Sequence, residues 1–353
     1  METLTAVQLS SLAALGALPF DDIIDVRSPA EFAEDHLPGA ISLPVLSNEE
    51  RARVGTIYVQ ESKFRARKVG AALVARNAAR HLEAALADRD GSWRPLVYCW
   101  RGGQRSGSFA TILKQVGWRA DTIEGGYRSY RRAVVDAMYD TPVPHRLILL
   151  DGNTGTAKTA FLAELAGAGH QVLDLEGLAH HRGSVFGGRG GQPSQKRLES
   201  GIAMALAGMD PARPVIVEAE SSQIGDLSVP PAVWTAMRAA PRLRIVAPLA
   251  ARARYLAGAY ADIVADPVRL DATLDKLIPM QGRERVEAWK ALGREGAFEA
   301  LAAALMEHHY DPRYAKQRER VGSGTQAQIS VDDLSEAGRR AAVPEISAAL
   351  ERL

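Results

Sequence analysis

The sequence predicts an α/β protein in which two open sheets of parallel strands follow one another along the chain. Short apolar stretches alternate with helix-like stretches from residue 5 to 135 and again from residue 147 onward, the alternation typical of parallel sheets covered by helices. A Thr-Pro-Val-Pro stretch at residues 141–144 indicates a stiff linker. The length of 353 residues fits two domains of roughly 150 residues each. We therefore expect domains at residues 1–140 and 145–353.

Composition excludes several classes of protein. A hydrophobic fraction of 46% and a charged fraction of 24% are typical of a soluble globular chain, and a net charge of +1 leaves nucleic-acid binding to local basic patches. The single cysteine excludes a disulfide within the chain and a multi-cysteine metal site. Because His180 and His181 are adjacent, they cannot face one way on a helix or strand, and we predict no metal site. The chain shows neither a signal-peptide pattern nor an apolar run of roughly 18 residues, so we expect a cytoplasmic protein without membrane contact.

The one cysteine lies where a reactive thiol is expected. An apolar strand is predicted at residues 95–98 and a helix from about residue 109, with Cys99 opening the loop between them. Loop amides and the helix dipole favour negative charge at that place, so the pKa of the thiol should be lowered and the thiolate should be a nucleophile. The other interpretation is a small buried apolar side chain. The residues expected to bind an anion beside Cys99 are Arg101, Gly102, Gly103, Gln104, Arg105 and Ser106.

The order of motifs in the first domain resembles the rhodanese domain. The motifs are a predicted strand at 22–27, a Ser-Pro helix start with an acid at residue 31, a His-Leu-Pro-Gly-Ala turn at 36–40, the Cys99 loop and a Glu-Gly-Gly turn at 124–126. The resemblance implies that Cys99 accepts a sulfur-group atom from an anionic donor and passes it on. The spacing of Cys99 and Arg105 also matches the Cys-x5-Arg loop of phosphatases, which remains an alternative.

Two basic stretches are candidates for binding a nucleic-acid backbone. Residues 63–80 carry lysines and arginines without any acid, and residues 127–132 interleave tyrosines with arginines, a mixture that can combine phosphate contacts with base stacking. A solvated helix face and an amphipathic packed helix are the alternatives. The candidate contacts are Arg65, Lys68, Arg76, Arg128, Arg131 and Arg132.

The second domain opens with a phosphate-binding motif. A buried strand at 147–150, a glycine-containing loop and a Lys-Thr pair that begins a helix match the plan of P-loop NTPases. Ala157 stands where the motif has its second glycine, and its methyl group restricts the backbone near the phosphates. The residues expected to hold a diphosphate are Gly152, Asn153, Thr154, Gly155, Thr156, Lys158 and Thr159.

Later strands of the second domain carry carboxylates at their ends. Asp174 and Glu218 follow or end predicted strands, as an acid that holds Mg²⁺ through water would. From about residue 251 the chain is predicted to be helical, with Arg252 and Arg254 able either to reach bound phosphates or to lie on the surface. The whole domain is therefore expected to be a doubly wound P-loop-type α/β domain with a helical C-terminal region.

Motifs in both domains together resemble the tRNA 2-selenouridine synthase family. The motifs are Val-Tyr-Cys-Trp-Arg-Gly-Gly at 97–103, Asp-Leu-Glu-Gly-Leu-Ala at 174–179, His-Arg-Gly-Ser at 181–184, Gln-Pro-Ser-Gln-Lys at 192–196 and His-Tyr-Asp-Pro at 309–312. The resemblance implies a transferase that replaces sulfur by selenium in wobble 2-thiouridine of tRNA, using selenophosphate. It also implies prenyltransferase activity, in which geranyl diphosphate gives an S-geranyl base that is then selenated.

The resemblance also implies roles for the two loops. Cys99 would take selenium from selenophosphate as Cys–Se⁻ and deliver it to C2 of the base, while the loop at residues 152–159 would hold the diphosphate of the prenyl donor. No tightly bound cofactor is implied apart from Mg²⁺ at the second loop, and the partners would be the anticodon arm of tRNA and a selenophosphate-producing enzyme. The alternative function is a thiosulfate-type sulfurtransferase fused to a P-loop kinase-like domain.

Overall fold

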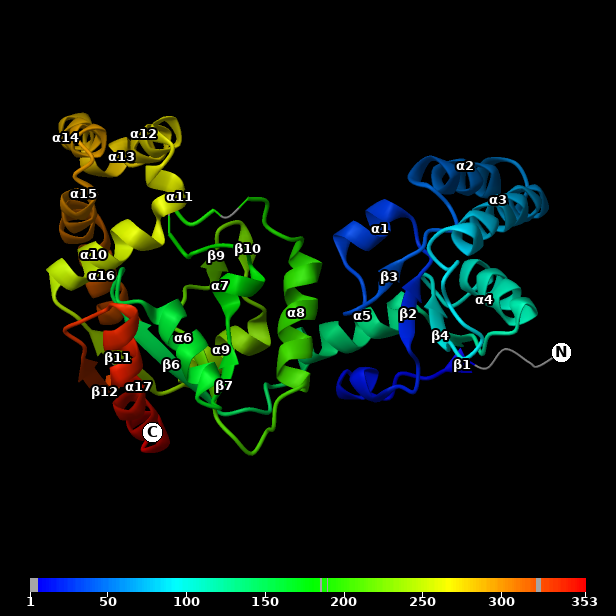
Figure 1. Cartoon of the computed structure of the whole chain (residues 1–353), viewed down its shortest axis with the longest axis horizontal. Helices are drawn as coiled ribbons and strands as arrows, with labels where there is room; N and C mark the ends of the chain where they lie inside the picture. Colours follow the sequence, from blue (N-terminus) through cyan, green and yellow to red (C-terminus); the bar gives the residue numbers. More distant parts are fainter. Residues whose placement is uncertain (1–5, 185, 189, 322–324) are drawn as a thin grey trace. The chain divides into compact units, whose positions relative to one another are not determined.

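The chain forms two compact units, each built on its own parallel sheet. The structure is a computed structural model and describes residues 6–184, 186–188, 190–321 and 325–353. One unit comprises Met1–Thr141 with Pro193–Gly208, and the other comprises Pro142–Gln192 with Met209–Leu353. The segment Pro193–Gly208, which lies inside the second half of the sequence, thus packs with the first unit (Figure 1).

The first unit holds a sheet of parallel strands in the order β1-β5-β4-β2-β3. All residues of the central strand β4 are buried, as its uninterrupted apolar sequence requires. The strands are β1 (Ala6–Val7), β2 (Asp22–Asp25), β3 (Ile41–Ser42), β4 (Pro95–Tyr98) and β5 (Asp121–Ile123).

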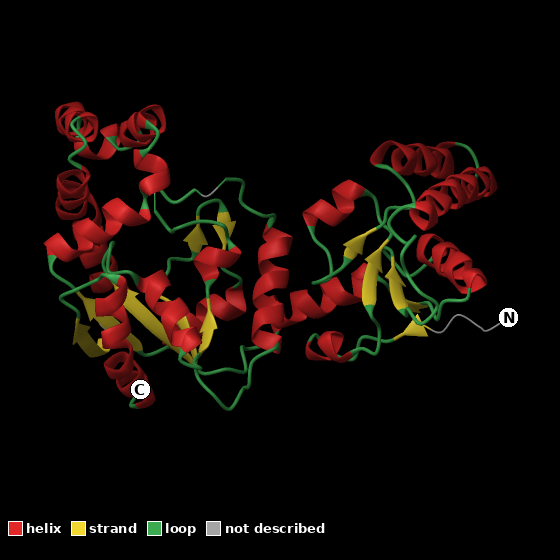
Figure 2. Cartoon of the chain, viewed as in Figure 1, coloured by secondary structure: helices red, strands yellow, loops and turns green. Residues whose placement is uncertain are grey.

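Helices cover both faces of this sheet (Figure 2). Apolar residues of α3 and α4, among them Leu73, Val74 and Phe109, pack on one face, whereas α5 presents buried Tyr127 and Tyr130 from the other side. The predicted helix start at Ser28 is confirmed, because Ser28 and Glu31 form a capping box. The helices are η1 (Ala13–Ala17), α1 (Pro29–Glu34), α2 (Asn48–Gln60), α3 (Lys63–Glu83), α4 (Gln104–Val116), α5 (Tyr127–Val135), η2 (Asp136–Asp140) and α8 (Gln195–Ala207).

Helix α8 joins the first unit through buried polar contacts. Asp35 accepts hydrogen bonds from the Ser200 hydroxyl at 2.7 Å and from the Tyr127 hydroxyl at 2.8 Å. The guanidinium of Arg131 forms an ion pair with Glu199, whose side chain is 1% exposed. A buried carboxylate without such partners would be costly, so these contacts explain why α8 packs in this unit.

The second unit holds another sheet of parallel strands, in the order β12-β11-β6-β8-β7. Its edge strand β12 follows most of the C-terminal helices in sequence, and the sequence analysis did not predict it. A short antiparallel pair, β9 with β10, lies outside the sheet. The strands are β6 (Leu147–Gly152), β7 (Gln171–Leu173), β8 (Val215–Glu218), β9 (Gln223–Ile224), β10 (Leu227–Ser228), β11 (Arg242–Val246) and β12 (Thr325–Ser330).

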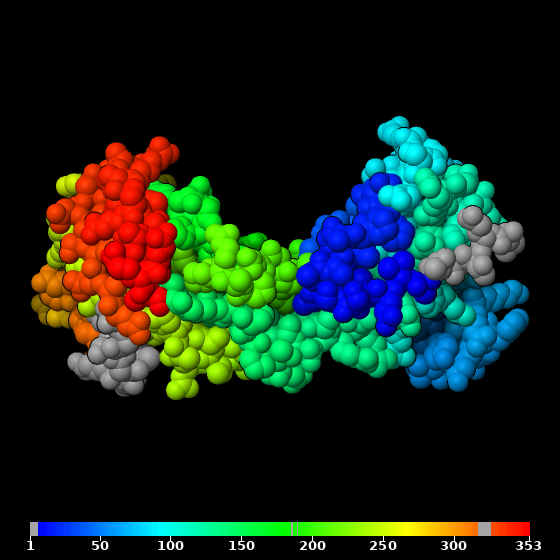
Figure 3. All heavy atoms as spheres, turned by 90° about the horizontal axis from the view of Figure 1, so that it is seen from below, coloured from blue at the N-terminus to red at the C-terminus, as the bar shows by residue number. Residues whose placement is uncertain are grey.

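Two of the apolar clusters in the described part of the second unit hold most of its helices. One joins α6 and α17 to the sheet through residues such as Phe161 and Ile346, and α17 is visible in red on the surface in Figure 3. The other is a helical cluster around Trp289 and Leu274. The helices are α6 (Lys158–Gly167), α7 (Leu175–Leu178), α9 (Pro231–Ala239), α10 (Leu249–Ala259), α11 (Ala261–Val264), α12 (Pro267–Asp275), α13 (Ile278–Gln281), α14 (Arg283–Arg294), α15 (Phe298–Leu305), η3 (Met306–Tyr310), α16 (Asp311–Val321) and α17 (Glu336–Glu351).

The predicted fold class is confirmed, since both sheets are parallel and covered by helices. The C-terminal region is mainly helical from α10 onward, with β12 as the interruption. Within the described residues, every helix is too short or too polar to cross a lipid bilayer.

Replacing Arg131 by Ala should destabilise the first unit, because it leaves the buried Glu199 carboxylate without its cationic partner. We expect a loss of about 2 kcal/mol, which lowers Tm by roughly 4 °C or more in a thermal unfolding scan. Arg132→Ala is the matched control, since Arg132 is exposed on the same helix. Equal Tm values for the two variants would contradict the structural role of the Arg131–Glu199 pair.

Candidate functional site

Cys99 lies at the carboxyl end of the central strand of the first unit. It follows β4 directly, and the predicted strand–loop–helix order is present. Helix α4 begins at Gln104 and not near residue 109 as predicted, so Arg105 and Ser106 lie in its first turn. The Sγ atom accepts hydrogen bonds from the Gly103 amide at 3.3 Å and the Ser106 hydroxyl at 3.2 Å. The residue is only 4% exposed. The thiol therefore lies in a small pocket of hydrogen-bond donors.

The surroundings of Cys99 favour the thiolate. Burial by itself opposes ionisation, but the hydrogen bonds from Ser106 and Gly103 and the positive charge of Arg105 outweigh burial and lower the pKa of Cys99 below that of an ordinary thiol. A thiol with a lowered pKa presents more of the nucleophilic form near neutral pH. The geometry thus suits a nucleophile better than an inert core cysteine.

The start of α5 holds the cysteine loop in place. The Tyr127 amide donates to the Cys99 carbonyl at 2.8 Å, and the Arg128 amide donates to the Trp100 carbonyl at 3.0 Å. Gly126 makes this approach possible: its φ is +58°, and a Cβ atom there would lie 2.2 Å from the Cys99 carbonyl oxygen. The Glu-Gly-Gly turn at 124–126 therefore fixes the position of the cysteine loop.

Arg101 and Arg105 differ in whether their charge is already paired. Arg105 forms an ion pair with Glu31 at 2.9 Å, and Glu31 also pairs with Arg51 at 3.0 Å. Burial acts against ionisation of Glu31, but Arg105, Ser28 and Arg51 overcome it and lower its pKa to about 2. Arg101 is exposed and forms no ion pair with any described side chain. Arg101 is thus the loop cation that is free to bind an anion, while Arg105 is anchored.

The basic residues predicted to contact nucleic acid fall into two groups. Arg65 pairs with Glu61 on the surface of α3. Lys68 and Arg76 on the same helix are exposed, as are Arg128 and Arg132 on α5. Arg131 differs, because its guanidinium is used by Glu199. We therefore correct the prediction for Arg131, whose role is in packing. The exposed candidates that remain are Lys68, Arg76, Arg128 and Arg132, with Arg65 partly engaged.

The loop between β6 and α6 makes a left-handed turn just before Lys158. Ala157, in the place of the motif glycine, adopts the left-handed conformation with φ of 60° and is 4% exposed. The alanine therefore keeps the glycine-like turn at a cost in local strain. Lys158 Nζ donates to the Gly152 carbonyl at 3.0 Å. Burial tends to lower the pKa of Lys158, but nearby acidic groups, Tyr314 and Glu220 first, raise it, so the lysine is charged.

Side chains from distant segments hold this loop in place. Asp311 accepts hydrogen bonds from the side-chain amide Nδ2 of Asn153 at 2.9 Å and from both terminal nitrogens of Arg252, at 2.9 and 2.7 Å. Arg252 also donates to the Thr154 carbonyl at 3.1 Å and is buried. Arg252 thus holds the loop in place from a buried position, which is neither of the two roles predicted for it, contact with phosphates or a place on the surface.

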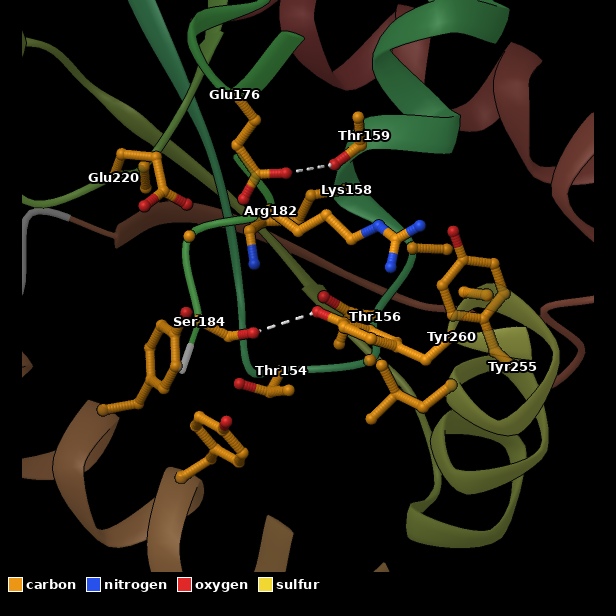
Figure 4. Close-up of a pocket in the computed structure, with 18 of the residues that line it drawn as sticks. Thr154, Thr156, Lys158, Thr159, Glu176, Arg182, Ser184, Glu220, Tyr255 and Tyr260 are labelled. Carbon is orange, nitrogen blue, oxygen red and sulfur yellow. Dashed lines mark hydrogen bonds between the residues drawn. The ribbon is translucent and has the colours of Figure 1, made fainter. Parts of the chain in front are cut away.

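A cavity of about 320 Å³ opens over the loop (Figure 4). Its polar side chains come from distant segments, with Lys158 and Thr159 from α6 facing Glu176, Arg182 and Glu220. The Thr159 hydroxyl donates to Glu176 at 2.9 Å. Burial and the charge of Glu220 raise the pKa of Glu176 to about 7. The cavity thus combines a cationic loop with two carboxylates, of which Glu176 changes charge near neutral pH.

Gly183 allows these carboxylates to approach each other. Its φ is +65°, and a Cβ atom there would lie 2.7 Å from a Glu176 oxygen and 2.8 Å from a Glu220 oxygen. The His-Arg-Gly-Ser motif therefore has a geometric reason for its glycine. Ser184 follows in the same motif and hydrogen-bonds the Tyr260 hydroxyl at 3.1 Å.

The carboxylates predicted for Mg²⁺ lie elsewhere. Asp174 caps the start of α7 by accepting from the Gly177 amide at 2.7 Å. Glu218 is buried, accepts from the Glu176 amide at 2.7 Å, and has a raised pKa because of burial and the charge of Asp174. Neither side chain lines the described part of the cavity. The two predicted carboxylates thus lie outside the lining of the cavity, whereas Glu176 and Glu220 belong to it.

A small apolar cavity of about 60 Å³ adjoins the polar one. The two share Thr154, Ser184 and Leu256 among their lining residues. Beyond these, the lining is almost entirely hydrocarbon and includes Phe186, Ile263, Leu270, Leu301 and Leu305. The site thus has a polar end at the loop and an apolar end among the helices.

Several residues of this site were not selected from the sequence. Glu176 belongs to one quoted motif and Tyr310 to another, so motif membership was the available signal for them. Glu220 lies two positions beyond the predicted Glu218, where the backbone has left β8. Tyr255, Tyr260 and Tyr314 come from helices whose relation to the loop depends on tertiary packing. These cavity residues are Glu176, Arg182, Ser184, Glu220, Tyr255, Tyr260, His309, Tyr310, Arg313 and Tyr314.

Comparison with known proteins gives matches in both units. Residues 7–133 match the family model of the rhodanese-like domain, and residues 145–278 match that of the tRNA 2-selenouridine synthase AAA domain. Proteins named tRNA 2-selenouridine synthase are similar over most of the chain. The one from Alcanivorax borkumensis is 33% identical over 83% of this chain and 88% of its own length. That from Shewanella loihica is 34% identical over 80% and 71%, and that from Nitrosomonas europaea is 36% identical over 65% and 61%.

The hydrogen bonds to Cys99 predict how its reactivity depends on pH. The rate of alkylation by iodoacetamide should reach half its maximum below the pH found for a free thiol, because the folded protein favours the thiolate. Ser106→Ala removes one donor and should move that midpoint upward by roughly one pH unit. Ser108→Ala, in the same helix, is the control. A midpoint for Ser106→Ala equal to that of the unchanged protein would refute the assigned cause.

Proposed function

Because this chain belongs to the tRNA 2-selenouridine synthase family, we propose that it replaces sulfur by selenium in wobble 2-thiouridine of tRNA. The donor in this proposal is selenophosphate, and Cys99 is the catalytic nucleophile. The observation that carries it is the thiol at the end of β4, buried among hydrogen-bond donors and with a lowered pKa. Such a group is suited to attack on an electrophilic carbon.

The loop after Cys99 supplies the anion site of the proposal. Arg101 provides a free charge and the amides of Gly102, Gly103 and Gln104 surround the start of α4, where negative charge is favoured. Ser106 serves the thiol directly. Arg105 contributes through its charge while its guanidinium stays bound to Glu31. In this arrangement selenophosphate would bind next to the sulfur atom.

Electron balance limits how Cys99 acts. Selenium in selenophosphate is already at the selenide level, so forming Cys–Se⁻ with release of orthophosphate would require an oxidant. A redox-neutral route requires none. The thiolate adds to C2 of the base and expels the sulfur leaving group, and the selenium of selenophosphate then displaces Cys99. Water cleaves the P–Se bond, which leaves orthophosphate and the selenated base.

The second unit supports the prenyl part of the proposal. Geranyl diphosphate combines a charged diphosphate with a hydrocarbon chain, and the loop at residues 152–159 faces a polar cavity that adjoins an apolar one. Lys158 and the loop amides would hold the diphosphate, and the apolar cavity would take the start of the chain. Geranylation of the sulfur turns it into a better leaving group for the exchange at Cys99.

The polar cavity also fits a magnesium ion. Thr159 and Glu176 are already 2.9 Å apart, and Glu220 lies beside them, so hard oxygen ligands converge at the loop as Mg²⁺ prefers. A bound ion would neutralise diphosphate charge there. We propose no other resident cofactor.

The partners follow from the proposed reaction. The tRNA would present its anticodon arm, and a selenophosphate-producing enzyme would supply the donor. Relatives carry the name of a tRNA-modifying enzyme, and we propose the cytoplasm as the location, where tRNA is available.

The alternative functions are less well supported by the site. In a phosphatase the arginine of the Cys-x5-Arg loop binds the phosphate, but Arg105 is held by Glu31. A thiosulfate sulfurtransferase fused to a kinase-like domain would use the polar cavity of the second unit but would leave the adjoining apolar cavity without a role. Turnover of thiosulfate with cyanide in the absence of RNA would favour that class.

Two substitutions test the proposal by separating its steps. Cys99→Ser should abolish selenation of S-geranylated tRNA while leaving geranylation intact. Lys158→Ala should lower geranylation about 100-fold, because it removes a charge from the diphosphate site, while selenation of tRNA geranylated beforehand continues. Lys276→Ala is the control, since Lys276 is exposed in the same unit. Nucleoside analysis of the tRNA by mass spectrometry measures both products. Full selenation by Cys99→Ser would refute the proposed role of Cys99.

A further inference from the structure

The space in front of Cys99 is larger than a small anion requires. A groove of about 1070 Å³ runs between α2 and α3 and ends at the cysteine loop. Cys99, Trp100 and Arg101 line one end of it, and the two helices form its sides. A selenophosphate ion is the size of phosphate and would fill only a small part. The groove therefore has room for a much larger substrate that reaches the thiol.

The charges in the groove favour a polyanion. Arginines at positions 51, 67, 101 and 105 line it, and none of the described lining residues is a carboxylate. Arg51 and Arg105 share Glu31, which lies outside the lining. Arg67 and Arg101 are exposed, and no ion pair involves either among the described side chains. Two uncompensated cations thus flank the route to Cys99, as phosphate contacts require.

The same groove also exposes apolar and aromatic surface from α2. Tyr58 is 49% exposed and Val59 is 82% exposed, both on α2. Gly55 leaves open space in the groove, since a Cβ atom there would meet nothing within 4 Å, whereas Gly70 lets Val54 of α2 approach α3.

The Tyr58 ring shares the groove with Arg67 and Arg101 and has the Lys63 ammonium 5.8 Å from its centroid. An exposed aromatic ring and cations on one surface can stack an unpaired base while holding its backbone.

We propose that the α2–α3 groove binds the single-stranded nucleotides around the base to be modified, with Tyr58 stacking on one base and Arg67 and Arg101 contacting phosphates. This inference rests on the proposed function for the identity of the RNA, and it adds the residues that admit the base to Cys99. On helix α3, Arg67 and Gly70 line the groove, whereas Arg65, Lys68 and Arg76 do not. Those three residues remain candidates for contacts farther along the tRNA.

Three substitutions on the groove test this inference. Tyr58→Ala removes the stacking ring and Arg67→Ala removes a phosphate contact. Gly55→Leu fills the groove, because a Cβ atom at Gly55 meets nothing within 4 Å, and leucine favours the helix. The controls are Arg119→Ala, an exposed arginine outside the groove lining, and Gly167→Leu, an exposed helical glycine that also has open space around it.

The probe is a 2-thiouridine-containing anticodon stem-loop, and its dissociation constant is measured with the full chain. Each groove variant should bind about tenfold more weakly, the size expected from loss of one stacked base or one good contact, while the controls bind as before. Arg67→Ala should also reduce the salt dependence by about one unit of slope. Alkylation of Cys99 by iodoacetamide in the free Tyr58→Ala and Arg67→Ala proteins should be unchanged.

Other outcomes overturn the inference or separate it from the proposed chemistry. Unchanged RNA affinity in all three groove variants would overturn it. The inference would also be overturned if RNA affinity were unchanged and selenation were lost only when the selenophosphate-producing enzyme supplies the donor. The groove would then bind that protein and not RNA. If the groove variants lose RNA affinity while Cys99→Ser retains selenation, the groove assignment stands and the proposed role of Cys99 fails.

Discussion

A buried thiolate is stable only where hydrogen bonds and positive charge outweigh the cost of burial, and the first unit is arranged around that requirement. Cys99 has both kinds of support, from Ser106 and Gly103 and from the charge of Arg105. These groups are in place because the start of α5 holds the loop, through the close approach at Gly126 and the hydrogen bond from the Tyr127 amide to the Cys99 carbonyl. Backbone geometry thus determines the chemistry of the side chain.

The second unit uses the same structural position for another purpose. Its loop also follows a central parallel strand and leads into a helix, so amides and a helix start again favour an anion. Here the support comes from Asp311 and Arg252, which brace the loop from behind. Glu176 and Glu220 line the cavity with Lys158 and distinguish this site from the cysteine loop. Carboxylates in this position can hold a metal ion or share a proton.

The sequence was informative where local pattern decides structure. Strands, the helix start at Ser28, the loop at Cys99 and the phosphate-type loop all follow from short-range rules, and the structure contains them. It was less informative where tertiary packing decides. Arg131 looks like a surface cation until Glu199, far away in sequence, is placed against it. Glu218 and Glu220 are neighbours in sequence, yet only packing reveals that Glu220 faces the cavity. Strand β12 pairs with β11 across the whole helical region, a separation that no local pattern reveals.

The central claim is that the Cys99 sulfur attacks C2 of the base, and intact-mass analysis with peptide mapping tests it directly. The protein is mixed with S-geranylated tRNA in the absence of selenophosphate and quenched by denaturation. The account predicts a covalent adduct between Cys99 and the tRNA, with release of geranyl thiol, and disappearance of the adduct when selenophosphate is added. A selenium adduct on Cys99 formed from selenophosphate alone, without RNA or an oxidant, would contradict it.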